Sequence, residues 1–204
     1  MALVDKPSTR EVKRLQTRER LLGAAVAEFK RAGVTAADVH EIVTAAGVAH
    51  GTFFFHFPTK EHVLLELERR EEERIAKHLA RFSAGNPDLA AVFDESIRQV
   101  RGLERRLGAL LFKDFLALHF SPTRPPLDES AEHPVVITVA HEVENARMLG
   151  RIDADVDPVN TAVFFLLGLY ALLTTTHQWP GQQKMIDDYV GRTLRSIGFA
   201  QRVD

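Results

Sequence analysis

The residues whose chemistry suits a binding site gather in one short stretch, between His50 and Lys60. Hydroxyl, imidazole and ammonium groups donate hydrogen bonds to phosphate oxygens, and a threonine hydroxyl can also bond the edge of a base. Phenylalanine rings can contact sugars or a thymine methyl, although Phe53 and Phe57 are expected in the core instead. The stretch is therefore predicted to contact DNA through His50, Gly51, Thr52, Phe54, Phe55, His56 and Lys60.

Two short helices and a tight turn are expected to position these side chains. Apolar residues on one helical face predict a first helix through residues 39–43. Gly47 tolerates the positive φ that the chain needs where it leaves this helix. Residues 49–57 form the second helix, which Pro58 ends because the residue before a proline is disfavoured in the α region. This order is the helix-turn-helix arrangement, whose second helix can enter the major groove of DNA.

The same region carries a longer pattern. It comprises Thr17-Arg18-Glu19-Arg20, Ala24, Ala25, Phe29, Gly33, Ile42, Ala45-Ala46-Gly47-Val48, Gly51-Thr52, His56-Phe57-Pro58 and Lys60-Glu61. Because order, spacing and turn chemistry agree, the segment from Thr17 to Lys60 resembles the N-terminal domain of the TetR family of transcription regulators. The resemblance implies an all-α protein. Residues 8–60 would form a three-helix DNA-binding domain, and residues 61–204 a larger helical domain for effector binding and dimerisation.

Two positions depart from the family pattern. Where the family usually has a phosphate-bonding threonine four residues after Gly33, this chain has Ala37. Thr35 or Asp38 is expected to cap the helix instead. Both are candidate DNA contacts, although an aspartate turned toward phosphate would repel it. The second helix contains Ala-His-Gly-Thr-Phe-Phe-Phe where the family often has Ser-Lys-Gly-Thr-Leu-Tyr-Tyr, so both phenol hydroxyls that could bond phosphate are missing.

Charge is distributed unevenly along the chain. Residues 1–60 hold nine Lys and Arg against six Asp and Glu, a net charge of +3, and the remainder holds 17 against 22, a net charge of −5. The positive end coincides with the predicted DNA-binding unit, as phosphate contacts require. Because the excess is small, a dimer that presents two such faces is expected. The basic side chains near the N-terminus form either a solvated helix face or an extension that lies along DNA: Lys6, Arg10, Lys13, Arg14 and Arg18.

Apolar periodicity predicts helices through most of the chain. A capping box at Ser8 and Glu11 starts the first helix, which ends near Gly33. Its inward stripe is expected to comprise Leu15, Leu22, Val26 and Phe29. Later helices are expected at residues 61–82, 88–106, 107–120, 134–148, 159–176 and 182–197. The charged run ERREEER, residues 68–74, indicates a solvated helix face. Residues 121–134, rich in proline, form an irregular loop that is either a gate or disordered.

Composition and motifs exclude several classes of function. The chain has no cysteine, which excludes disulfides, Cys-ligated zinc and thiol redox sensing. It has no Gly-rich phosphate loop, no G-x-S-x-G elbow and no H-E-x-x-H motif, so no catalytic residue and no cofactor are expected. The N-terminus lacks the apolar run of a signal peptide, which indicates a cytoplasmic protein. Four histidines are scattered through the larger domain, and no metal site is predicted from them: His119, His133, His141 and His177.

One segment, residues 159–176, contains no charged side chain and is borderline in length for a membrane span. Asn160, several threonines and the missing basic flank favour a buried central helix, without contact to a membrane. Together with the final helix, this segment is expected to form a two-fold four-helix interface in a homodimer.

The larger domain is rich in phenylalanine, and the family resemblance implies a small effector bound between its helices. A largely apolar cavity with a few polar groups is expected, although each ring could equally pack in the core. Its lining is predicted to comprise Phe93, Phe112, Phe115, His119, Phe164, Phe165 and Trp179.

The sequence therefore predicts a sequence-specific DNA-binding regulator of transcription, a homodimer on a palindromic operator in double-stranded DNA. Repression is the usual role in the family, and a small, largely apolar effector would release the protein from the operator. The alternative is a helical ligand-binding module with weakened or lost DNA binding, which the missing tyrosines, Ala37 and the small charge excess favour. An enzyme that uses the phenylalanine-rich cavity has no motif to support it.

Overall fold

The computed structural model describes residues 8–126 and 133–199, which form helices, turns and loops but no strand. The helices are α1 (Thr9–Ala36), α2 (Val39–Ala46), α3 (His50–His56), α4 (Lys60–Ser83), α5 (Leu89–Leu107), α6 (Ala109–Ala117), the 3-10 helix η1 (Leu118–Phe120), α7 (Pro134–Met148), α8 (Pro158–Thr175) and α9 (Gln182–Ser196). The all-α prediction is confirmed. Part of the predicted loop at 121–134 and Lys6 of the basic segment lie outside the described residues.

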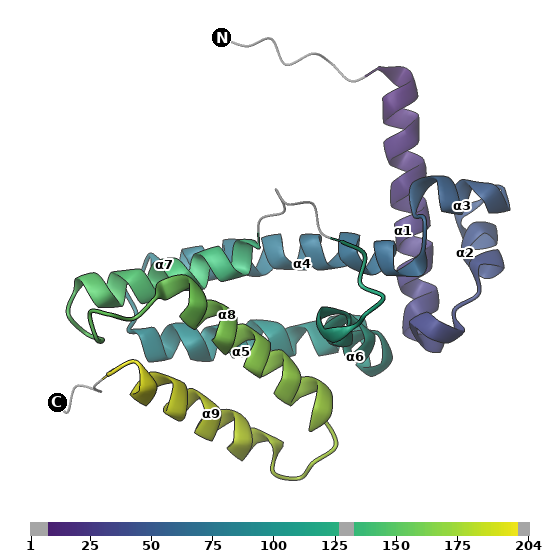
Figure 1. The fold of residues 1–204 in the computed structure, drawn as a ribbon. Helices are drawn as coiled ribbons and strands as arrows, with labels where there is room; N and C mark the ends of the chain where they lie inside the picture. Colours follow the sequence, from purple (N-terminus) through teal and green to yellow (C-terminus); the bar gives the residue numbers. More distant parts are fainter. Residues whose placement is uncertain (1–7, 127–132, 200–204) are drawn as a thin grey trace.

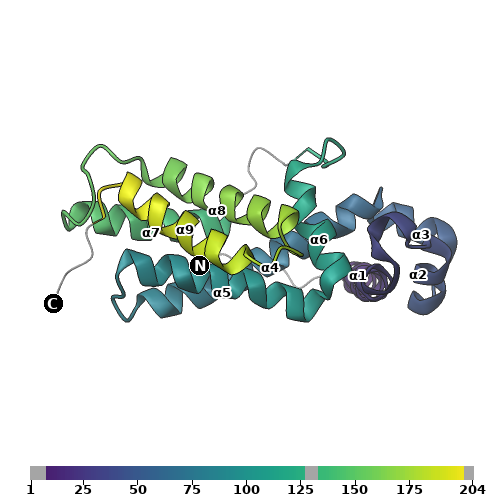
Figure 2. The same ribbon diagram turned by 90° about the horizontal axis from the view of Figure 1, so that it is seen from below.

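The helices form an elongated molecule with α1, α2 and α3 together at one end (Figure 1). α4 runs from this end into a bundle with α5, α7, α8 and α9, and α6 packs against α1. A view turned by 90° shows α1 end-on beside α2 and α3, with the other helices extending away to one side (Figure 2). The helix-turn-helix segment is therefore joined to the bundle through α4 and through the contact of α1 with α6.

Local chemistry explains where several helices begin and end. The Ser8 hydroxyl accepts a hydrogen bond from the Glu11 backbone N–H at 3.2 Å, as the capping box predicts. Asp157 caps α8 in the same way, at 2.8 Å from the Asn160 nitrogen. The predicted helix at residues 107–120 is shorter than expected, because Gly108 adopts a φ of 76° and separates α5 from α6.

A continuous apolar core runs through the helix-turn-helix segment and the bundle. In the bundle, Phe93 of α5 and Phe165 of α8 stack with ring centroids 4.0 Å apart. The Tyr189 hydroxyl of α9 shares its single O–H donor between the Phe164 and Phe165 carbonyls, whose oxygens lie 2.8 and 2.9 Å away. Gly168 makes this approach possible, because a Cβ on Gly168 would overlap the tyrosine hydroxyl. The absence of a side chain at Gly168 therefore allows α9 to pack this closely on α8.

Two expectations about exposure are wrong. Leu15 lies on the surface, because the first turns of α1 project beyond the other helices (Figure 1). The run at residues 68–74 is not a solvated face. Glu68 is buried, and the side chains of Glu71 and Glu72 are mostly buried. Their carboxylates form ion pairs with cationic groups from other parts of the chain, such as Arg106 with Glu71. The charged run, which the sequence placed on the surface, therefore joins α4 to neighbouring elements.

The outer face of α8 is apolar, with Val159, Phe164 and Leu167 exposed. Within the described residues, α8 is also the one helix whose length and composition would suffice to cross a membrane, and a third of its residues are buried. α9 differs, since its apolar side chains face inward and its outer face carries charged residues.

Candidate nucleic-acid interface

The predicted helix-turn-helix is present, and its turn chemistry is as expected. The Asp38 carboxylate caps α2 by accepting a hydrogen bond from the His40 backbone N–H at 2.7 Å. Gly47 ends α2 in the left-handed region, with φ 64° and ψ 44°. The Val48 N–H then bonds the Val43 carbonyl at 3.0 Å, which closes the turn before α3 begins.

α3 has one buried face and one exposed aromatic face. Phe53 and Phe57 are fully buried, which confirms that they are core residues. The Phe55 side chain is 75% exposed, and Phe54 is also exposed beside the His50 ring, with centroids 5.6 Å apart. Of the other predicted contact residues on this helix, Gly51 is exposed, whereas Thr52 and His56 are half-buried. The helix therefore offers stacking and van der Waals surface with few charges.

Arg18 of α1 holds the end of α3. Its Nη1 donates to the His56 carbonyl at 2.5 Å, and its guanidinium lies 4.2 Å from the centre of the Phe57 ring. Burial, together with the positive charges of Arg18 and Arg14, lowers the pKa of His56 below its usual value. The lowered pKa favours the neutral imidazole, which is a weaker phosphate donor than the protonated ring that the sequence suggested.

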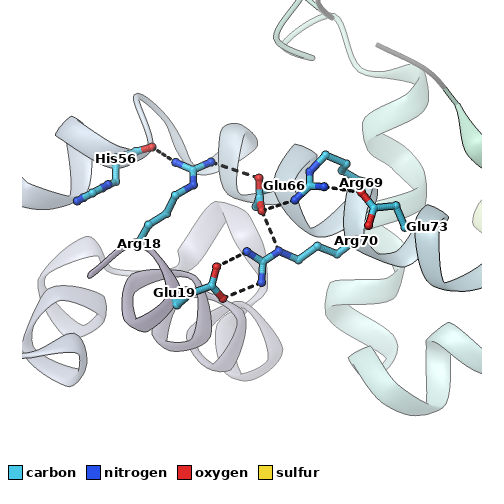
Figure 3. A network of polar contacts seen from close by, with 7 residues as sticks. All are labelled: Arg18, Glu19, His56, Glu66, Arg69, Arg70 and Glu73. Carbon is cyan, nitrogen blue, oxygen red and sulfur yellow. Dashed lines mark hydrogen bonds and ion pairs between the residues drawn. The ribbon is translucent and has the colours of Figure 1, made fainter. Parts of the chain in front are cut away.

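Figure 3 shows how the same arginine joins an ion-pair network on α4. Glu66 accepts hydrogen bonds from Arg18, Arg69 and Arg70 at 3.3, 3.0 and 2.8 Å. Arg70 also reaches back to Glu19 of α1 through two further bonds, one of them 2.8 Å long. Burial disfavours the charged form of Glu66, but the arginine hydrogen bonds outweigh burial and lower its pKa. The network therefore ties α1 and the end of α3 to α4.

The remaining candidate contacts lie where α1, α2 and α4 meet. Lys60, the first residue of α4, donates from Nζ to the carbonyls of Thr35 and Ala37 at 2.8 and 3.2 Å. Its ammonium thus satisfies carbonyls at the end of α1. Thr35 and Asp38 are exposed, but the Asp38 carboxylate is engaged as the α2 cap. Thr59 precedes α4, but its side chain caps no backbone N–H of the helix, and its hydroxyl lies 3.0 Å from His62 Nδ1 instead.

The seven residues predicted to line an effector cavity have different surroundings. Five are buried or nearly so: Phe93, Phe112, Phe115, His119 and Phe165. The other two lie on the surface, where Phe164 is 69% and Trp179 58% exposed. Three surface hollows of the described residues are lined by other side chains.

Sequence reasoning missed a contact that ties α6 to the end of α1. The Asp114 carboxylate of α6 accepts a hydrogen bond from the Val34 backbone N–H at 2.7 Å. This N–H is available because Gly33, with φ 76° and ψ 162°, breaks the regular course of α1. Gly33 belongs to the sequence pattern, but no local signal pairs it with a carboxylate about 80 residues away.

Comparison with known proteins gives a context for this geometry. The family model described as "Bacterial regulatory proteins, tetR family" matches residues 21–67. RolR in complex with resorcinol is similar with a TM-score of 0.70 and 21% identity, over 92% of this chain and 90% of that chain. FadR from Thermus thermophilus, in complex with lauroyl-CoA, has a TM-score of 0.67 and 21% identity, over 92% and 97%. The SmeT–triclosan complex has a TM-score of 0.56 and 22% identity, over 88% and 90%.

Proposed function

We propose that this chain is a dimeric, cytoplasmic repressor of the TetR family, because residues 21–67 match the family model of bacterial regulatory proteins of that name. It binds a palindromic operator and leaves it when a small effector binds to the bundle. Residues 8–60 read the DNA, and residues 61–204 bind the effector and dimerise. The observation that carries the proposal is the exposed face of α3, which the buried rings of Phe53 and Phe57 hold outward.

α3 enters the major groove and reads it mainly by shape and apolar contact. Phe54 and Phe55 contact sugars or thymine methyl groups, and Gly51 lets the helix backbone approach the duplex. Thr52 and His50 donate hydrogen bonds to a base edge or a phosphate. Three other polar candidates around this helix contact the DNA backbone: Thr35, His56 and Lys60.

Lys60 has to divide its donors between the protein and the DNA. Its ammonium has three N–H donors, and the Thr35 and Ala37 carbonyls account for two. The third can reach a phosphate without the loss of either bond, at the start of α4 where the helix dipole favours an anion. The Asp38 carboxylate, in contrast, stays on its cap and limits how closely a phosphate can approach there.

The homodimer forms through α8 and α9. The apolar outer face of α8, with Phe164 and Leu167, supplies the surface that a second copy would bury, and the charged outer face of α9 supplies its polar edge. Phe164 thus belongs to the dimer interface more than to an effector cavity. Two α3 helices in one dimer would then reach successive major grooves, roughly 34 Å apart.

The effector is a small, largely apolar molecule with a few polar groups. Resorcinol, lauroyl-CoA and triclosan, which are bound to proteins of this fold, each combine a ring or chain with hydrogen-bonding groups. Phe112, Phe115 and His119 are the inner residues that such a molecule would contact. An effector that enters between α5 and α8 would have to displace the stacked rings of Phe93 and Phe165, which offers a way to move α5 against α8.

Two contacts can carry that movement to the DNA. Asp114 links α6 to the bend in α1, and Glu66 links α4 to α1 and the end of α3. A shift of either helix changes the position of α3 relative to its partner in the dimer. A coupling of about 1–3 kcal/mol is enough to change operator affinity roughly 5- to 150-fold.

The alternative, a ligand-binding module with weakened DNA binding, has specific support. α3 contains no lysine or arginine, the pKa of its one half-buried histidine is lowered, and two donors of Lys60 are engaged within the protein. The two functions differ in a measurable way, since a repressor selects one sequence and a weakened module selects none.

Selection of bound duplexes from a random pool, with purified protein at near-physiological salt and competitor DNA, tests the proposal. A palindrome is the expected result. Thr52→Ala should then change the preferred base at one position, and Lys60→Ala should weaken binding to all sequences alike. A flat pool from folded dimeric protein, with and without candidate effectors, would contradict repression and support the module.

A further inference from the structure

A cluster of carboxylate and imidazole groups lies where the middle of α4 meets η1 and the start of α7. Glu68 and Glu72 are one turn apart on α4 and therefore share a face. His133 is the residue that precedes α7, and His119 belongs to η1. These histidines are separated along the chain, and the sequence predicted no metal site from them, but the fold brings His133 beside Glu72 and His119 beside Glu68.

The ligand atoms of this cluster are close together. One atom each from Glu68, Glu72 and His133 lies within 4.8 Å of the other two. His133 Nδ1 is 3.3 Å from Glu72 Oε1, and His119 Nε2 is 3.2 Å from Glu68 Oε1. The two glutamate side chains and His119 are largely buried, and His133 is partly buried. Because little water reaches these carboxylates, their negative charges are costly to bury without a positive partner.

Of the two carboxylates, Glu68 is paired with an arginine and Glu72 with a histidine. Arg124 bonds both oxygens of Glu68, at 2.8 and 3.0 Å, and is the permanent cation in contact with it. Among the described residues, Glu72 has one ion-pair partner, the His133 imidazole, whose Nδ1 lies 3.3 Å from the Glu72 Oε1. Neutral imidazole nitrogens and carboxylate oxygens are also the donor set that divalent transition metals prefer in a site without cysteine.

We propose that Glu68, Glu72 and His133 bind a divalent transition-metal ion such as Zn²⁺, with His119 as the fourth ligand. A metal would bond one oxygen of Glu68 and leave the other to Arg124, which then orients the ligand from outside. Donor atoms of a tetrahedral zinc site lie roughly 3.4 Å apart, given bonds of about 2.0–2.2 Å. The widest separation among the ligand atoms of Glu68, Glu72 and His133, at most 4.8 Å, needs a contraction of up to about 1.4 Å, which rotation of the two glutamate side chains can supply.

Zinc binding by the metal-free, full-length protein, free of any affinity tag, tests the proposal. The protein is titrated with Zn²⁺ against a chromophoric chelator, and one ion per chain is expected. Glu72→Gln and His133→Gln should each weaken binding at least about tenfold. Glu73→Gln and His141→Gln serve as matched controls, because both side chains lie outside the cluster, and they should bind as the wild type does.

Co²⁺ in place of Zn²⁺ reports on geometry, through the visible absorption bands of a tetrahedral site. The wild type should show these bands, and His119→Ala should lose them. Circular dichroism melting of each metal-free variant checks that it is folded. Absence of stoichiometric zinc, or equal affinity in the cluster variants and the controls, would overturn the proposal. Because neither measurement uses DNA, the outcome is independent of the repressor function.

Discussion

Gly168→Ala is the most direct test of how α9 packs on α8. A Cβ at this position would overlap the Tyr189 hydroxyl and lie 2.6 Å from its Cζ, so the ring has to leave its place. The hydroxyl then loses its hydrogen bonds to the Phe164 and Phe165 carbonyls. The substitution thus changes packing and hydrogen bonding at once.

The expected cost follows from these contacts. Overpacking typically costs about 1–3 kcal/mol, and each lost hydrogen bond about 0.5–1.5 kcal/mol. Alanine in place of glycine inside a helix offsets about 0.5–1 kcal/mol of this. With the shared hydrogen bond of the single O–H counted once, the free energy of unfolding should therefore fall by about 0.5–4 kcal/mol for Gly168→Ala.

The same substitution at Gly23 is the matched control, because a Cβ there, on the exposed side of α1, would meet no described atom within 4 Å. Gly23→Ala should raise the free energy of unfolding by about 0.5–1 kcal/mol. Urea unfolding followed by circular dichroism measures both, at one fixed protein concentration because the protein is proposed to dimerise.

Equal gains in stability for the two alanine variants would refute the packing described for Tyr189. A further check is the pair of Gly168→Ala and Tyr189→Phe. The phenylalanine removes the atom that clashes most, so the double variant should lose less stability than the sum of the two single variants.

Three other predictions concern the junction and the DNA-binding face. Asp114→Ala leaves the Val34 N–H without its acceptor, so the free energy of unfolding measured in urea should fall by about 1–3 kcal/mol. Asp114→Asn keeps an acceptor oxygen and should lose less stability, and equal losses for the two variants would contradict the hydrogen bond. Phe55→Ala should weaken operator binding while the stability changes by less than about 0.5 kcal/mol, because the ring is exposed, and Phe53→Ala should cost about 3–5 kcal/mol. His56→Gln should leave the slope of log K against log salt unchanged, because burial and nearby arginines lower the pKa of the imidazole and so favour its uncharged form. A slope smaller by about 1 would instead show that the imidazole carries charge to a phosphate.

Features set by local chemistry were predictable from the sequence. The helix that begins at Pro134 and ends at Met148 follows from its proline and from the glycine beyond its end, and the structure has the same bounds. Gly47 marked the turn between α2 and α3, because few other residues adopt a φ of 64° without strain. Burial of Phe53 and Phe57 followed from helical spacing. Each of these depends on residues a few positions apart.

Features that depend on distant partners were not predictable. The run at residues 68–74 has the composition of a solvated face, and only the approach of η1 and α5 shows that Glu68 and Glu71 are enclosed. The bond from Arg18 to the His56 carbonyl spans 38 residues, and a backbone acceptor leaves no mark in the sequence. Phe164 shows an error in the other direction. Its aromatic side chain suggested the lining of a cavity, but its position on the outer face of α8 makes it a surface residue.

The junction between the helix-turn-helix segment and the bundle bears on the construction of hybrid regulators. A chimera that joins residues 1–60 of this chain to the bundle of a relative would keep Lys60 but lose Glu66 and Arg70, which hold α1 and α3 in place. It would also lose Asp114, the acceptor for the Val34 N–H. The helix-turn-helix segment is therefore not interchangeable by itself: a graft that keeps the proposed DNA specificity has to carry α4 through residue 70 and install an aspartate at the matching position of α6.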